Sequence, residues 1–202
     1  MKINAALVKK QTLKPKATDK SVVLAFLSVA VGIVAGGVLF TLNQELCANE
    51  ISGVFARFTE SFSTRSDADV MLTMLFTRLI YFAVILVSGT SIAGTGIALI
   101  YTVINFSSLS MIASYLYSAH NLQGLEYCLL VFYPGKILYI LSSLLVLKNA
   151  LEYCDTLTHK PIDAINSKKR YIGTGAVIFA IYTSGIIIDF ILIKMFSSLF
   201  SF

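Results

Sequence analysis

The chain has 202 residues, of which 56% are hydrophobic and 13% charged, and its mean hydropathy is +0.79. Soluble domains carry about 25% charged residues, so this composition excludes an ordinary soluble protein and leaves no room for a separate soluble enzyme domain beside several membrane spans. The net charge of +5 does not indicate nucleic-acid binding, because the 16 Lys and Arg residues are scattered among apolar runs and form no basic stripe. The sequence predicts an all-α protein, a polytopic transmembrane helical bundle.

Residues 1–20 form a basic tail with six lysines and one acidic residue. The uncharged run 21–42 that follows is too long for the apolar region of a cleaved signal peptide, so we expect an uncleaved first span. Gly32 and Gly36 form a GxxxG motif within this run. Such a motif either lets another helix backbone approach closely or is a fortuitous spacing of small residues.

Residues 43–69 form an acidic outer loop with five acidic residues and two arginines. Within it, residues 51–62 place Phe55, Phe58 and Phe62 at helical spacing on one face, with polar side chains opposite. We expect an amphipathic helix that either lies in the membrane interface or docks a partner protein on this face. The following Ser-Asp-Ala-Asp sequence matches a capping box, which predicts the start of the next helix.

Four further spans are predicted from the remaining apolar runs and the polar or glycine-rich breaks between them. They cover about 70–88, 92–119, 125–147 and 171–199, with a polar inner loop at 148–170, so that residues 21–200 form a single transmembrane domain. Pro134 and Gly135 fall inside the fourth span, where we expect a kink or an interruption.

Five spans place the two termini on opposite sides of the membrane, and the distribution of basic residues predicts which side is inside. With the amino terminus inside, the inner segments hold 11 of the Lys and Arg residues and the outer loops hold two. Because inner loops carry an excess of Lys and Arg, the sequence predicts an inside amino terminus and an outside carboxyl terminus.

Arg78, Lys136 and Asp189 are charged residues inside the predicted spans. A charge at a span centre costs about 2.5–3.5 kcal/mol on insertion scales, so such residues are candidates for function. A rise of about 1.5 Å per residue places all three toward the outer leaflet. We expect Asp189 to pair with Arg78 or Lys136, either as a structural ion pair that fixes helix register or as part of an ion or substrate path. A shift of the span boundaries by one turn would instead place one of these charges at the interface. Lys194 points away from Asp189 around the helix and is expected to snorkel outward.

The sequence contains no HExxH, GxSxG, GxGxxG or P-loop motif, so we expect no catalytic site and no cofactor. Cys154, Asp155 and His159 imitate a Cys–His nucleophile, but a single such group in a polar loop is a common chance arrangement. The few cysteines and histidines are too widely spaced for a zinc site. Cys47 and Cys128 fall on the same side of the membrane in this topology, which would permit a disulfide.

Three segments carry a resemblance to a known family: VSGTSIAGTGIALIYTVINFSSLSMIASYL, NLQGLEYCLLVFYPGKILYILSSLLVL and IIIDFILIKMF. They resemble stage II sporulation protein M and its relatives, which are small bacterial five-span membrane proteins with an inside amino terminus. The matching features are Gly124 before the fourth span, Pro134 within it, and the late acidic residue Asp189.

The resemblance implies a non-enzymatic scaffold or anchor in the cell membrane. Such a protein localises peptidoglycan hydrolases of the stage II sporulation D and P types at the septum during engulfment of the forespore. The expected partners are the lipid bilayer, other membrane-anchored proteins and further copies of the chain itself. The alternative is a membrane subunit of a small transporter or permease that works with a separate ATPase, although the five predicted spans show no inverted repeat.

Overall fold

The computed structural model describes residues 17–159 and 161–196, and this part of the chain is α-helical. In chain order it contains α1 (Ala17–Leu42), α2 (Gln44–Thr64), α3 (Asp67–Ser88), α4 (Gly94–Tyr127), the π-helical turn η1 (Cys128–Phe132), α5 (Tyr133–His159) and α6 (Pro161–Phe196). Within the described residues, four segments are long and apolar enough to span a membrane, namely Lys20–Leu42, Asp67–Ser88, Gly94–His159 and Ser167–Phe196. The prediction of an all-α chain is confirmed for the described residues, and the four segments fit a multi-pass membrane protein.

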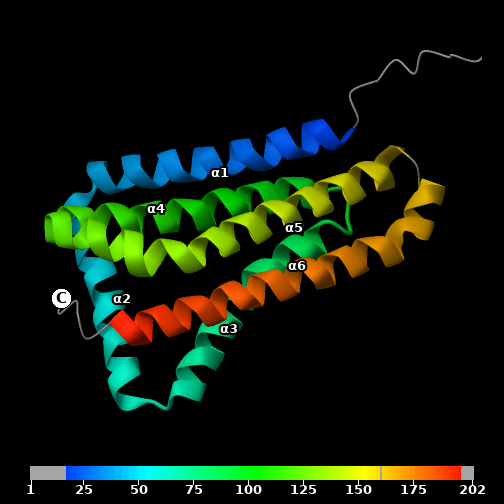
Figure 1. Cartoon of the computed structure of the whole chain (residues 1–202). Helices are drawn as coiled ribbons and strands as arrows, with labels where there is room; N and C mark the ends of the chain where they lie inside the picture. Colours follow the sequence, from blue (N-terminus) through cyan, green and yellow to red (C-terminus); the bar gives the residue numbers. More distant parts are fainter. Residues whose placement is uncertain (1–16, 160, 197–202) are drawn as a thin grey trace, which may run out of the picture.

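The third of these segments has 66 residues and turns back on itself. Asn121 has φ 49° and ψ −123°, which breaks the helix at this point. A positive φ is tolerated by Asn better than by most other residues. Just beyond the break, Gly124 lies so close to the carbonyl of Leu116 that a Cβ atom would not fit. The two arms therefore lie side by side and run in opposite directions, as Figure 1 shows for α4 and α5.

The helix ends gather at two ends of the molecule (Figure 1). The start of α1, the α3–α4 turn and the α5–α6 junction lie at one end, which we call the Lys20 end. The turn at Asn121 and the end of α6 lie at the opposite end, which we call the α2 end because α2 runs across it. Of the predicted basic tail, residues 1–16 lie outside the described residues, as do residues 197–199 of the predicted last span.

The GxxxG motif of α1 packs against α4 within the same chain. A Cβ atom on Gly32 would lie 2.7 Å from the carbonyl oxygen of Val103, and one on Gly36 would overlap the carbonyl oxygen of Ser107. Only glycine allows two helix backbones to approach this closely. Of the two interpretations of the motif, close approach is therefore correct, and the partner is α4.

The first two helices after α1 differ from the prediction in length but not in order. The helix predicted at 51–62 covers Gln44–Thr64, so most of the predicted loop 43–69 is helical. Ser66 caps α3 as predicted, because its Oγ accepts a hydrogen bond from the Asp69 amide at 3.2 Å.

The polar segment 148–170 is not a loop, which corrects the sequence prediction. Residues 148–159 continue α5, and residues 161–170 form the beginning of α6. Hydropathy marks the part of a helix that is apolar enough to lie in lipid, whereas a helix can continue beyond that part into water. The helix end was therefore placed too early by the apolar pattern.

Pro134 does not interrupt its helix, so of the two predicted alternatives, a kink or an interruption, the interruption is wrong. The π-helical turn η1 precedes it, and the amide of Tyr133 donates to the carbonyl of Cys128, five residues earlier. Proline lacks an amide hydrogen and its ring crowds the preceding turn, and a wider π-helical turn provides the extra space. The local disturbance is thus absorbed without a break between η1 and α5.

Candidate functional site

The structure brings Arg78, Lys136 and Asp189 together from three helices, and we call this group the ion cluster. Lys136 Nζ donates a hydrogen bond to Asp189 Oδ2, and Arg78 Nη1 lies 2.6 Å from the same oxygen. Asp189 is 1% exposed and Lys136 is 7% exposed. The predicted pairing is therefore present with both cations at once, and it joins α3, α5 and α6 at one buried point.

Gly135 provides the space in which the carboxylate of Asp189 lies. A Cβ atom on Gly135 would lie 2.5 Å from Asp189 Cγ and would overlap Oδ1. Oδ1 is buried against this glycine and has no hydrogen-bond partner among the described residues. Of the two predicted helix-break residues, Gly135 thus serves the contact between α5 and α6, while Pro134 follows the π-helical turn.

A cluster of tyrosines surrounds Arg78, and the sequence analysis missed it. The Arg78 guanidinium carbon lies 5.7 Å from the centroid of the Tyr139 ring, a cation–π geometry, and the Tyr182 hydroxyl donates to the Arg78 carbonyl at 2.8 Å. The Tyr139 ring lies 5.8 Å from Tyr81 and 5.3 Å from Tyr182, and Tyr81 stacks on Tyr101 at 5.5 Å. The sequence feature that could have predicted this cluster is the recurrence of tyrosines in the middle of apolar spans, because a buried tyrosine hydroxyl needs a polar partner.

The ion cluster contains more positive than negative groups. With all three side chains ionised, two cations share one carboxylate, and no second Asp or Glu among the described residues lies within ion-pair distance of either cation. Arg78 Nη1 is buried, and its short contact with Asp189 lacks hydrogen-bond geometry. One N–H group of the guanidinium is therefore left without an aligned acceptor in a region of low dielectric constant, which is unfavourable.

A cavity of about 130 Å³ adjoins the ion cluster, and we call it the cluster cavity. It is lined by Thr77, Arg78, Tyr81, Asn105, Leu109, Lys136 and Tyr139. The side-chain amide of Asn105 also donates to the hydroxyl of Tyr139, so the wall between α4 and α5 is hydrogen-bonded. The cavity thus combines two cations with neutral hydroxyl and amide groups.

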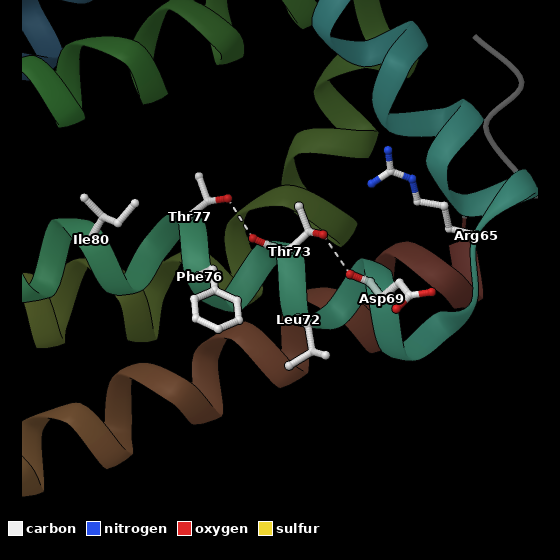
Figure 2. A pocket seen from close by; sticks show the side chains of 7 residues that line it. All are labelled: Arg65, Asp69, Leu72, Thr73, Phe76, Thr77 and Ile80. Atoms are coloured by element: carbon white, nitrogen blue, oxygen red, sulfur yellow. Dashed lines mark hydrogen bonds between the residues drawn. The ribbon is translucent and has the colours of Figure 1, made fainter.

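An open groove of about 690 Å³ runs along α3 and shares Thr77 with the cluster cavity. This α3 groove is lined by Arg65, Asp69, Leu72, Thr73, Phe76, Thr77 and Ile80. Figure 2 shows Asp69, Thr73 and Thr77 in a row along the helix, with each threonine hydroxyl donating to the carbonyl four residues earlier, at 2.8 and 2.7 Å. Tyr81 continues this spacing of four residues into the cluster cavity.

The predicted docking face on α2 is used in part within the chain. Phe55 is half-buried, and its ring lies 6.1 Å from that of Tyr115 on α4. Gln44 at the start of α2 donates to the hydroxyl of Ser118 at 2.9 Å. The side chains of Phe58 and Phe62 lie outside the described residues. Gln44 and Phe55 thus attach α2 to α4.

Cys154 and His159 do not form a nucleophile pair. The sulfur of Cys154 is buried, accepts a hydrogen bond from Thr95 at 2.8 Å and lies 3.2 Å from the carbonyl of Ser91, so it faces the α3–α4 turn. His159 instead contacts Asp155 on the exposed side of α5, at 3.2 Å. The thiol therefore holds the turn against α5.

The remaining cysteines and the last lysine complete the set of predicted residues. All three cysteines are buried and unpaired, so Cys47 and Cys128 form no disulfide.

Lys194 of α6 makes an exposed ion pair with Asp67 at the start of α3. It faces away from the ion cluster, as expected, and has a carboxylate partner there. Among the described residues, no group of His, Cys, Asp and Glu is arranged to hold a metal ion.

No family model, curated protein or solved structure matches this chain.

Proposed function

We propose that this protein is a non-enzymatic scaffold in the cell membrane, which crosses the bilayer five times and holds α2 at the outer surface. The observation that supports this function best is the ion cluster itself. Asp189 is 1% exposed and contacts cations from two other helices, so one carboxylate joins α3, α5 and α6. Buried polar contacts of this kind can specify helix register, which suits a protein whose role is to keep a fixed shape.

The proposed five crossings follow from the hairpin in the third apolar segment. A straight helix of 66 residues would be about three times as long as the hydrocarbon core is thick, whereas the turn at Asn121 divides the segment into two arms. The excess of Lys and Arg in residues 1–20 and 148–170 supports an inside location for the Lys20 end. In this arrangement α2 lies at the outer interface.

Helix α2 is the proposed docking element. It is attached to α4 through Gln44 and Phe55, while Leu46 and Val54 are 68% and 58% exposed. Exposed apolar side chains on a helix that crosses the end of a bundle suit either the bilayer interface or a partner's apolar surface. The resemblance described above suggests membrane-anchored peptidoglycan hydrolases as that partner, and the sporulation septum as its place; both rest on the resemblance.

A transporter subunit is the second candidate, and the α3 groove, with its row of Asp69, Thr73 and Thr77, is the observation that favours it. Toward the Lys20 end the bundle is closely packed. Ile85, Val146 and Leu147 are each 0% exposed there, as are the hydroxyl residues Thr102 and Ser142. Because a substrate path must continue to the other side, this close packing supports the scaffold more than the transporter.

Photocrosslinking in intact membranes tests the scaffold. A photoreactive amino acid replaces Leu46 or Val54 on α2 and, as a matched control, the equally exposed Val23 on α1. We expect both α2 positions, and not position 23, to capture one membrane-anchored cell-wall hydrolase, identified by mass spectrometry. Capture of lipid alone at all three positions would contradict the docking role of α2.

A further inference from the structure

The ion cluster lacks one negative charge, and its surroundings do not supply it. Arg78 and Lys136 face the single carboxylate of Asp189, and the other groups lining the cluster cavity are hydroxyl, amide, aromatic and aliphatic. Arginine keeps its proton at all ordinary pH values, so the imbalance is relieved either by loss of a proton from Lys136 or by an approaching anion. An isolated excess charge in a region of low dielectric constant is otherwise costly.

Two buried donors face this cavity. Arg78 Nη1 contacts Asp189 Oδ2 at 2.6 Å without hydrogen-bond geometry, and the hydroxyl of Tyr81 lies near the polar side chains of Thr102, Asn105 and Ser143. Arg78 and Tyr81 line the cluster cavity, together with the amide of Asn105. A group with several acceptor oxygens and a negative charge would satisfy these donors at the same time as it neutralises the cluster.

The cavity is reached from the α2 end along α3. Asp69, Thr73 and Thr77 lie in a row on the wall of the α3 groove (Figure 2), and Thr77 belongs to both the groove and the cavity. From Asp69 to Tyr81 this row rises by about 18 Å at about 1.5 Å per residue. Arg65 lines the groove near its outer end and places a further cation at the entrance.

We propose that the cluster cavity binds a phosphate-type oxyanion, carried either by an anionic phospholipid headgroup or by a free ion. The volume of about 130 Å³ has room for a phosphate group and is too small for a whole lipid. Arg78 offers the planar fork of donors that matches phosphate geometry, and Lys136 adds a point charge. This site would exist whether or not α2 docks a partner, so its test is independent of the proposed scaffold function.

The experiment measures the thermal unfolding midpoint of the full chain in a neutral detergent. Three additions are compared: inorganic phosphate, phosphatidylglycerol and the uncharged lipid diacylglycerol. We expect a saturable rise with phosphatidylglycerol or with inorganic phosphate, and none with diacylglycerol. A rise with phosphatidylglycerol alone identifies a lipid headgroup, and a rise with both identifies the oxyanion itself as the ligand. No rise with either phosphate source would overturn the proposal.

Two variants locate the site without removing any member of the ion cluster. Asn105→Asp places a second carboxylate on the cavity wall, so it should raise the midpoint without added anion and weaken anion binding at least tenfold. Thr77→Leu places a larger apolar side chain at the junction between groove and cavity, so it should weaken binding by blocking the entrance, by about tenfold. Thr41→Leu is the matched control, because Thr41 is likewise an exposed helical threonine bonded to its own backbone. If Asn105→Asp and Thr77→Leu bind the anion as well as the control does, the anion binds elsewhere and the proposal is wrong.

Discussion

Asp189 and Gly135 are in direct contact across the interface between α6 and α5. A Cβ atom on Gly135 would lie 3.0 Å from the backbone nitrogen of Asp189 and 2.5 Å from its Cγ. The residue after this glycine is Lys136, which donates to the other oxygen of the same carboxylate. The glycine and the lysine therefore act on one side chain, the first by leaving space and the second by supplying charge.

Replacing Gly135 with alanine should destabilise the protein by about 1–3 kcal/mol, because the added methyl group would displace Asp189 from both cations. Gly173→Ala on α6 is the matched control, since a Cβ atom there would have no neighbour within 4 Å. Alanine favours a helix over glycine by up to about 1 kcal/mol, so the control should be neutral or stabilising. Thermal unfolding in detergent measures both, and equal effects of the two variants would show that the contact with Asp189 is unimportant.

The three members of the ion cluster should contribute unequally. Asp189→Asn leaves two cations without a carboxylate, so it should cost on the order of 3–5 kcal/mol. Arg78→Gln or Lys136→Gln should cost less, because Asp189 keeps one partner and the cluster becomes neutral.

Double-mutant cycles that combine Asp189→Asn with each cation variant measure the pairwise coupling. We expect more than about 0.5 kcal/mol for both pairs, the level at which residues in contact depart from additivity. Single variants that are as stable as the wild type yet inactive would instead assign these charges to a path or a partner contact.

The GxxxG motif provides a prediction about assembly. Gly36→Ala should lower stability, because its Cβ atom would overlap the Ser107 carbonyl of α4, while Gly37→Ala should not, because its nearest neighbour would be Ser110 Oγ at 3.8 Å. Neither variant should change the oligomeric state measured by light scattering, since the motif is occupied within one chain. A dissociated oligomer in Gly36→Ala with unchanged stability would show that the motif packs between copies.

The sequence was sufficient to predict that Asp189 pairs with Arg78 or Lys136. Charges are so costly in lipid that a buried carboxylate requires a cation from another helix, and counting residues from the span ends places all three at similar depth. The sequence did not indicate that both cations bind at once, nor the place of the tyrosines around Arg78. These depend on helix rotation, which is fixed by side-chain packing between segments far apart in the chain.

Other features needed the structure for similar reasons. The hairpin at Asn121 was expected as a break between spans, but the positive φ and the contact between Gly124 and Leu116 come from the packing of the two arms. The helix that packs against Gly36 could not be predicted from the sequence, because several of the predicted helices carry small residues. The last residues of α5 (148–159) and the first residues of α6 (161–170) were predicted as a loop. A polar sequence shows where a helix leaves the membrane, but it does not show where the helix ends.

The most direct test of a five-pass scaffold that presents α2 outside is the labelling of introduced cysteines with a membrane-impermeant maleimide in intact cells. The native cysteines are buried and serve as the unlabelled background. Arg57→Cys on α2 and Leu122→Cys at the Asn121 turn lie at the α2 end, while Thr90→Cys and Lys168→Cys lie toward the Lys20 end, and all four positions are exposed. We predict that positions 57 and 122 react before permeabilisation and that positions 90 and 168 react only after it. Labelling of positions 57 and 90 from the same side, or of positions 57 and 122 from opposite sides, would contradict the account.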